Sequence, residues 1–266
     1  MHARHAATGM LAAHARHAVA GALAAAIAVS TTCGGSAAPD PDLPDIVAQS
    51  IAYHGGALYE SSRMTMTITS LSGSFDIEAT RNGGDFEFVV TDPARGDRPE
   101  RRVRLTNDGV TEWRGGVEAE LDAEGERRAT AFVNARVFFP LLPHTLKGGD
   151  IHFEDRGLDR WNGRDLHRMR VSFTPGTSND ADDAYTFWFD PDTGRIEQFG
   201  YDFDNGLRFR RATSFERVGG VLFSDQDNYA VDGGKVPVDT LTPDYVVNTM
   251  RLLSHVAISD VTVEPL

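Results

Sequence analysis

Cysteine and lysine are the scarcest chemically active side chains in this sequence of 266 residues. The single cysteine, Cys33, excludes an internal disulfide and any metal site that needs several cysteines. Lys147 and Lys235 are the only lysines, and each adjoins a Gly-Gly pair. The chain therefore offers little material for a buried Schiff-base lysine.

Positive charge is also in short supply. The chain has 39 acidic and 26 basic residues, and two of those arginines lie in residues 1–32, which contain no acid. An acidic surface argues against nucleic acid or anionic lipid headgroups as the main partner. We therefore expect no nucleic-acid binding.

Long hydrophobic runs are absent apart from the N-terminus. Arg4 and Arg16 precede an apolar stretch over residues 18–29, which has the length of a signal peptide and is short for a membrane span. After Cys33, a Gly-rich and then Pro-containing segment predicts a tether. We expect a signal peptide over residues 1–32, a flexible tether over 33–42 and a single half-barrel domain over 43–266.

The segment around Cys33 resembles a bacterial lipoprotein signal, which implies acylation of that cysteine. It departs from the usual pattern at Ser30 and Thr32. The alternative is an ordinary signal peptide that is cleaved near residues 36–38. Both alternatives predict export, to the periplasm or to a membrane-anchored place, with an outer-membrane lipoprotein favoured.

Short alternating strands dominate the remainder. Met64, Met66 and Ile68 alternate with threonines, and similar runs recur with turn signals every 8–12 residues or so. Two segments have helical spacing instead, residues 42–56 and residues 130–139. These patterns predict a mainly β (α+β) fold, a half-open antiparallel barrel of about 10–11 strands with two or so covering helices. Its inner face holds either an open cavity or a filled core.

The hairpin Tyr201–Arg211 poses a question of register. A two-residue Asn205-Gly206 turn mixes apolar and charged side chains on each face. A three-residue loop, residues 204–206, pairs Tyr201 with Phe209 and Asp202 with Arg208, which sorts the two kinds. We therefore predict that the aromatic residues point inward and the arginines outward.

Longer stretches resemble a known family, namely "IAYHGGALYE", "FFPLLPHTL", "TFWFDPDTGRIEQFGYD", "GLRFRRATSFERVGGVLFSDQDNY" and "LLSHVAISDVTVEPL". They look like an uncharacterised family of exported proteins of the Bacteroidota type, within the LolA/LolB-like superfamily of lipoprotein carriers. The resemblance implies a half-barrel that is lidded by helices and holds acyl chains. It also makes "VFFPLLPHTL" the nearest candidate for a membrane-touching loop, unless those side chains tuck under the sheet.

Motifs for catalysis are absent, since the sequence has no G-x-S-x-G elbow, H-E-x-x-H pair or phosphate-binding glycine loop. A metal site at His152 and His167, with Glu154 and Asp155, is weighed against ordinary surface histidines. The acidic run 178–183 is interpreted as a solvated hairpin tip. We expect no metal and no cofactor.

Three functions stay open. The favoured one is a non-catalytic, monomeric envelope lipoprotein that binds a lipid or lipoprotein acyl chain and is anchored to the membrane through Cys33. The others are a small-molecule hydrolase or other enzyme that uses a His/carboxylate cluster in the same cavity, with His144, His152 and His167 as its candidate histidines, and a structural protein-interaction module with a filled core. The cavity candidates are Met64, Met66, Phe86, Phe88, Phe138, Phe139, Leu142, Phe187, Tyr201, Phe203 and Phe209. The candidates for a polar cluster at the barrel mouth are Arg208, Arg210, Asp225, Asp227 and Tyr229.

Overall fold

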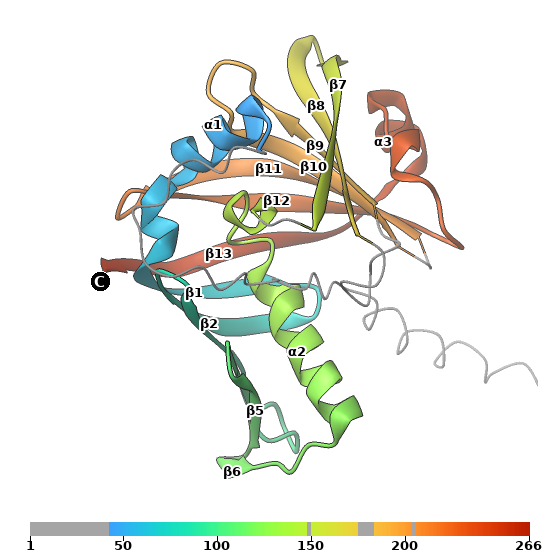
Figure 1. Ribbon diagram of the computed structural model, residues 1–266. Coiled ribbons are helices and arrows are strands. Elements are labelled where there is room, and N and C mark those ends of the chain that lie inside the picture. Colours follow the sequence, from blue (N-terminus) through green and yellow to red (C-terminus); the bar gives the residue numbers. More distant parts are fainter. Residues whose placement is uncertain (1–42, 148–149, 175–183, 204–205) are drawn as a thin grey trace, which may run out of the picture.

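One antiparallel sheet organises the computed structural model, which describes residues 43–147, 150–174, 184–203 and 206–266. Within these residues the sheet has 13 strands, in the order β6-β5-β4-β3-β2-β1-β13-β12-β11-β10-β9-β8-β7. The sheet bends around α2 without closing into a barrel (Figure 1). The strands are β1 (Ser61–Ser70), β2 (Gly73–Asn82), β3 (Asp85–Asp92), β4 (Arg101–Thr106), β5 (Gly109–Arg114), β6 (Val117–Glu118), β7 (Ile151–Trp161), β8 (Arg164–Phe173), β9 (Ala184–Phe189), β10 (Ile196–Phe203), β11 (Gly206–Val218), β12 (Val221–Asp232) and β13 (Arg251–Pro265).

The described helices are α1 (Asp45–His54), α2 (Ala123–Val137) and α3 (Pro243–Thr249), with short 3-10 turns η1 (Gly56–Glu60), η2 (His144–Leu146) and η3 (Val238–Thr240). Asp122 caps α2 by accepting a hydrogen bond from the Gly125 backbone N–H at 2.7 Å. None of these helices is long and apolar enough to span a membrane.

The prediction of a mainly β, half-open antiparallel fold is confirmed, with more strands and one more helix than expected. Helix α2 begins well before the predicted start at Thr130, because its first two turns are mostly exposed and therefore lack an apolar pattern. Helix α3 was missed, although Thr242 caps it and Pro243 occupies its first position, which is a typical helix start.

The N-terminal half-sheet, β1–β6, has one covered face. Its inner face, which α2 covers, buries Met64, Phe75, Ile77 and Phe88 together with Val133 of the helix. The outer face carries polar side chains that bond to one another across strands, such as Thr67 to Asp76 and Arg63 to Glu78. The predicted alternation therefore holds in this half.

The C-terminal half-sheet, β7–β11, is covered on both faces. On the inner face Phe187, Phe199 and Tyr201 pack against α1 and the segment 138–146. On the outer face, side chains of η3, α3 and their flanks cover a second aromatic cluster, which includes Trp161, Trp188, Leu207 and Phe209. All six residues of β9 are buried as a result.

The predicted register of the β10–β11 hairpin is wrong by one residue. Tyr201 pairs with Arg208, Asp202 with Leu207 and Phe203 with Gly206, while residues 204 and 205 of the turn lie outside the described residues. The prediction assumed one solvated face, whereas both faces are buried here and both therefore carry aromatic residues. The arginines Arg208 and Arg210 consequently share the inner face with Tyr201, and Phe209 lies on the outer face.

The apolar segment after α2 packs under the sheet, which is the alternative to a membrane-touching loop. Phe138, Phe139, Leu141 and Leu142 are each at most 7% exposed. The Phe139 ring stacks on Phe199 with ring centroids 5.3 Å apart. This segment therefore fills the inner face of the C-terminal half-sheet and is not a protruding membrane loop.

Candidate functional site

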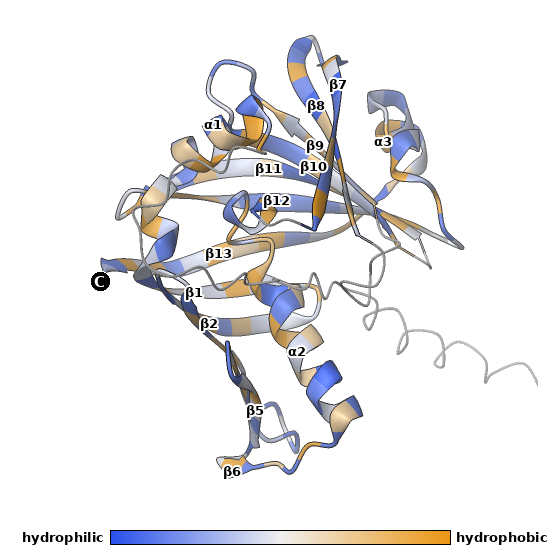
Figure 2. Cartoon of the chain, in the orientation of Figure 1, coloured by the Kyte–Doolittle hydropathy of each residue, from blue (hydrophilic) through white to orange (hydrophobic). Residues whose placement is uncertain are grey.

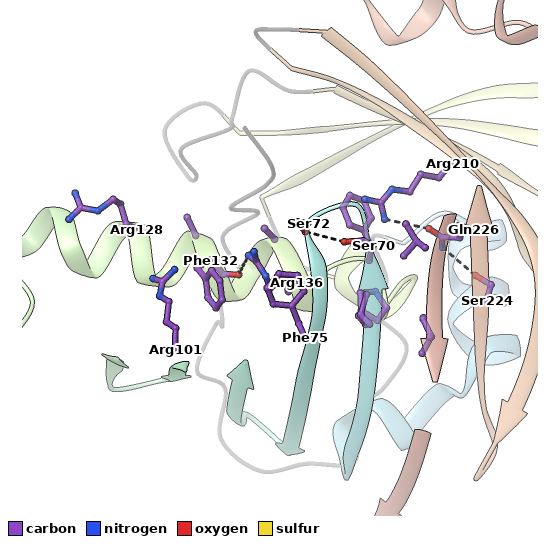
Figure 3. Close-up of a pocket in the computed structure, with 17 residues that line it drawn as sticks. Ser70, Ser72, Phe75, Arg101, Arg128, Phe132, Arg136, Arg210, Ser224 and Gln226 are labelled. Carbon is purple, nitrogen blue, oxygen red and sulfur yellow. Dashed lines mark hydrogen bonds between the residues drawn. The ribbon is translucent and has the colours of Figure 1, made fainter. Parts of the chain in front are cut away.

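A cleft of about 390 Å³ lies on the inner face where α2 diverges from the middle of the sheet. Its walls come from α2, β1, β2, β4, β11, β12 and β13, so residues far apart in the sequence meet there (Figure 3). Ligand pockets in proteins typically measure about 300–1,000 Å³. The cleft is thus at the lower end of the size that accommodates a small organic ligand.

Apolar side chains form the floor and one wall of the cleft. Phe75 and Phe132 meet edge to face, with centroids 6.2 Å apart. The remaining apolar lining comes from both sides, and consists of Ile68, Ala131, Ala135, Phe139, Pro140, Val256 and Ile258. Helix α2 carries hydrophobic and hydrophilic residues in alternation along its length (Figure 2), so it contributes both apolar and polar side chains to the cleft.

The polar part of the cleft contains four arginines and no acidic residue among the described lining residues. Arg101 is ion-paired to the buried Glu112 at 2.7 Å, and Arg128 is ion-paired to Glu124 at 3.2 Å. The other two arginines, Arg136 and Arg210, have no carboxylate within 4.0 Å in the part of the chain that the structure describes.

Aromatic rings contact both of these guanidinium groups. That of Arg136 lies 3.8 Å from the Phe132 ring centroid and 4.2 Å from that of Phe75. The Arg210 group lies 4.0 Å from the Phe139 centroid. Such cation–π contacts are attractive and do not use the N–H donors of the guanidinium group.

Few acceptors reach these two arginines. Arg136 donates from Nη1 to the Phe132 carbonyl at 2.8 Å, and Arg210 donates from Nη1 to Gln226 Oε1 at 3.5 Å. The Nε atoms of both residues are buried and have no hydrogen-bond partner in the described structure. Burial lowers the pKa of Arg136 to about 10, with nearby Asp92 raising it and Arg101 lowering it further. Arg136 therefore stays cationic at neutral pH but at an electrostatic cost.

A small second cavity of about 20 Å³ lies behind the first and is lined in part by His54, Leu142 and Phe199. Both cavities contact Phe139, Pro140 and Gln226. Phe139 and Pro140 therefore stand between the open cleft and the filled core of the C-terminal half-sheet.

The eleven predicted cavity residues fall into four separate places. Phe139 lines the cleft and Leu142 lines the small cavity. Phe209 is wrong as an inner-face residue, because the observed register turns it to the outer cluster. The others pack in the inner-face core without lining the cleft, namely Met64, Met66, Phe86, Phe88, Phe138, Phe187, Tyr201 and Phe203.

The predicted polar cluster is also divided. Arg210 lines the cleft, and Arg208 stacks over Phe203 at 4.8 Å nearby. Asp227 and Tyr229 instead contact Arg211, which donates to the Tyr229 hydroxyl at 2.9 Å. Asp225 accepts hydrogen bonds from Ser214 and from the Ile258 backbone. The sheet alternation therefore separates the arginines from the carboxylates that were expected to join them.

The side chains that sequence reasoning missed come mainly from α2 and the strands opposite. Phe132, Ala135 and Phe139 follow helical spacing, and Arg136 lies beside them on the same helix. Placing Arg136 in a site required knowledge of which strand faces it, and Phe75 and Ile258 are far away in the sequence.

Among the described residues, no histidine contacts a carboxylate in the cleft or in the small cavity. His144 is buried, stacks on Tyr59 with centroids 5.1 Å apart and lies 3.4 Å from Arg81. Its pKa is held well below the usual value by burial and by Arg81 and Lys147. His167 pairs with Asp155 at 2.8 Å, and His152 contacts Thr174. No group of three or more potential metal ligands occurs within the described residues, and residues 178–183 lie outside them.

Comparison with solved structures shows which proteins have a similar fold. A LolA superfamily protein from Nitrosomonas europaea, NE2245, is similar with a TM-score of 0.50 and 12% identity, over 83% of this chain and 93% of that one. A DUF1329 family protein from Desulfovibrio piger shows a TM-score of 0.45 and 11% identity, covering 82% and 91%. A putative outer membrane lipoprotein-sorting protein domain from Vibrio parahaemolyticus shows 0.42 and 10%, covering 82% and 91%. The similarity to the Nitrosomonas europaea protein shows that the chain has a LolA-like fold.

The sequence itself places the chain more narrowly. Residues 123–258, slightly more than half of the chain, match the family of unknown function DUF6503, and the protein belongs to that family. No curated protein matches it.

Proposed function

We propose that this protein is a non-catalytic cell-envelope protein that binds the hydrocarbon chain of a lipid or lipoprotein in the cleft beneath α2. The observation that carries the proposal is a solvent-connected cavity of about 390 Å³ whose floor is made of aromatic and aliphatic side chains. A volume near the lower limit for ligand pockets suits one chain rather than several. The LolA-like fold is consistent with this use.

Filling the cleft tests this proposal. Ala135 projects from α2 into the lining, so Ala135→Trp would occupy the cavity with an indole ring. Ala123 is exposed at the start of the same helix and lines no part of the cleft, which makes Ala123→Trp the matched control. We expect a fluorescent fatty acid to bind the parent protein and the control, and to lose at least about tenfold in affinity for Ala135→Trp.

The same preparations can be extracted for lipid mass spectrometry. We expect the parent protein to release a lipid that Ala135→Trp lacks. The proposal fails if neither the extract nor the titration shows a bound amphiphile, or if the two tryptophan variants behave alike. All three proteins carry Cys33→Ser, so that an acylated N-terminus is not mistaken for a ligand.

Export and anchoring form a separate part of the proposal. We place a signal peptide over residues 1–32, acylation at Cys33, a tether over 33–42 and one domain over 43–266, as a monomer at the outer membrane or in the periplasm. The pattern of Arg4, Arg16 and the following apolar stretch supports this. Mass spectrometry of the mature N-terminus should show a diacylglyceryl-type mass increase at Cys33 that Cys33→Ser abolishes; an unmodified N-terminus near residue 38 would contradict it.

A further inference from the structure

The sign of the charge in the cleft is opposite to that of the chain. Acidic residues outnumber basic ones by 39 to 26 overall, yet the described lining contains four arginines and no acid. A hydrocarbon site alone needs no charge of either sign, and charged residues are costly to bury without a counter-charge. The concentration of arginine at this place therefore calls for a specific explanation.

Two of the four arginines are explained by the protein itself. Arg101 has Glu112 as a carboxylate partner, and Arg128 has Glu124, and each carboxylate also pairs with a second arginine. Arg136 and Arg210 have no such carboxylate partner within the described chain. Each has five N–H donors, of which the structure satisfies one with a neutral oxygen.

Cation–π contacts with phenylalanine explain how these two groups are held but not what they bind. The Arg136 guanidinium lies close to the Phe132 and Phe75 rings, and that of Arg210 lies close to the Phe139 ring. A guanidinium is planar and its N–H groups match the two oxygens of a carboxylate or phosphate. The two guanidinium groups come from α2 and from β11, and both line the same space (Figure 3).

Neutral donors complete this polar rim. The hydroxyls of Ser70 and Ser72 lie 3.0 Å apart, and the Gln226 amide donates to Ser224 at 3.3 Å. All four residues line the cleft, so hydroxyl and amide groups accompany the two arginines. Hydrogen-bond donors thus surround a space whose floor is apolar.

We infer that the cleft takes an anionic single-chain amphiphile, whose carboxylate or phosphate is bound by Arg136 and Arg210 and whose chain lies against Phe75, Phe132 and Ile258. This inference rests on the proposed function and adds the chemical class of the ligand. It assigns Arg136 and Arg210 as headgroup-binding residues, and it limits the occupant to one chain. The acidic surface and the cationic cleft then act at different places on the same molecule.

Matched twelve-carbon probes test the headgroup. The neutral dye N-phenyl-1-naphthylamine is displaced from the full-length Cys33→Ser protein by dodecanoate, dodecyl phosphate, dodecanol or dodecyltrimethylammonium. We expect the two anions to compete about ten- to hundredfold more strongly than dodecanol, because each anion gains charge-assisted hydrogen bonds to the arginines. The cation should compete least. The ratio between carboxylate and phosphate identifies which of the two acids the site prefers.

Arginine variants test the assignment. Arg136→Gln and Arg210→Gln should each weaken dodecanoate about tenfold or more while changing dodecanol by less than about twofold. Arg211→Gln is the matched control, because Arg211 adjoins Arg210 in β11 but contacts Tyr229 and Asp227 instead of the cleft. Far-ultraviolet circular dichroism confirms that each variant is folded.

The outcomes separate the two levels of the proposal. Equal binding of dodecanol and dodecanoate overturns the anionic headgroup but leaves a hydrocarbon site. Displacement of the dye by none of the four probes overturns both. If Arg136→Gln does not fold, the headgroup series on the parent protein and the Arg210→Gln variant still decide the question.

Discussion

The two halves of the sheet have the same antiparallel pairing but differ in how their faces are covered. The N-terminal half-sheet buries one face under α2 and leaves the other to water, and a cleft remains between helix and strands. The C-terminal half-sheet buries both faces, with the segment 138–146 packed against one and η3 and α3 against the other. The cleft therefore lies beside the singly covered half, and the doubly covered half contributes Arg210 of β11 to its wall.

The largest effect should come from the outer face of the doubly covered half. Trp188 is fully buried, meets Trp161 at a centroid distance of 4.9 Å and donates to Asp159 at 2.9 Å. Trp188→Ala should lower the free energy of unfolding by about 3–5 kcal/mol, because a large core cavity replaces the indole. Chemical denaturation measures it, and a loss below about 1 kcal/mol would show that the outer cluster is dispensable.

The second effect is a dependence of stability on pH. Burial, together with Arg217 and Arg195, lowers the pKa of His54 from 6.5 to about 4, against an opposing hydrogen bond at Leu222. The neutral ring accepts a hydrogen bond from the Ile196 backbone at Nε2, 3.2 Å away. Between pH 6.5 and 4, His54 is therefore protonated in the unfolded chain but neutral in the folded chain. The free energy of unfolding consequently falls as the pH decreases through that window.

For a pKa shift of that size, protonation of His54 lowers the free energy of unfolding by at most about 3 kcal/mol. Denaturation midpoints between pH 7 and 4 should show it, and His54→Gln should have a flatter profile than the parent protein. Parallel profiles for the two proteins would contradict the role of His54, since the remaining titrating groups, including His144, are common to both.

A third effect concerns Asp202, which the sequence suggested as an outward partner of Arg208. It is buried and accepts hydrogen bonds from the backbone N–H groups of Ala184 at 3.1 Å and Val238 at 2.8 Å. Asp202→Ala should cost about 1–3 kcal/mol by leaving these donors unsatisfied. Asp202→Asn retains an acceptor oxygen and should cost less; the reverse order, measured by denaturation, would refute this explanation.

The smallest effect is expected on the solvated face of the N-terminal half-sheet. Thr69 is exposed and its hydroxyl bonds only to Ser74, at 2.8 Å, among described residues. Thr69→Ala should change the free energy of unfolding by less than about 0.5 kcal/mol, as is usual for surface substitutions. A loss of stability as large as that of Trp188→Ala would contradict the expected difference between the solvated face and the doubly covered half-sheet.

The same contrast explains how far the sequence could be interpreted. Met64, Met66 and Phe88 were placed correctly on the inner face because threonines and charges alternate with them on a face that water covers. Phe209 was misplaced because both faces of the C-terminal half-sheet carry aromatic clusters, so the alternation along β11 does not tell which of its faces is the inner one. The LolA-like architecture could be predicted from strand patterns and from the family resemblance.

The cleft could be predicted only in part. Phe139 was predicted as a cavity candidate, with a membrane-touching loop as the alternative for its segment, and Arg210 as a candidate for a polar cluster. Their meeting with Arg136 depends on how α2 lies across the sheet. That placement is set by packing of Val133 and Val137 against residues of β1–β4, which are separated from α2 by long stretches of chain. Local sequence patterns carry no direct information about such contacts.

An open sheet has two terminal strands, and here both are poor templates for aggregation. The edge strand β6 has two residues, and β7 is interrupted by a register shift between Asp155 and Leu158. The exposed side chains of Glu154, Asp155 and Arg156 lie at that interruption. Short, bulged and charged edges discourage pairing with a second chain. The molecule can therefore keep its barrel unclosed, and its inner face accessible, without offering a strand on which fibrils or edge-to-edge dimers would grow.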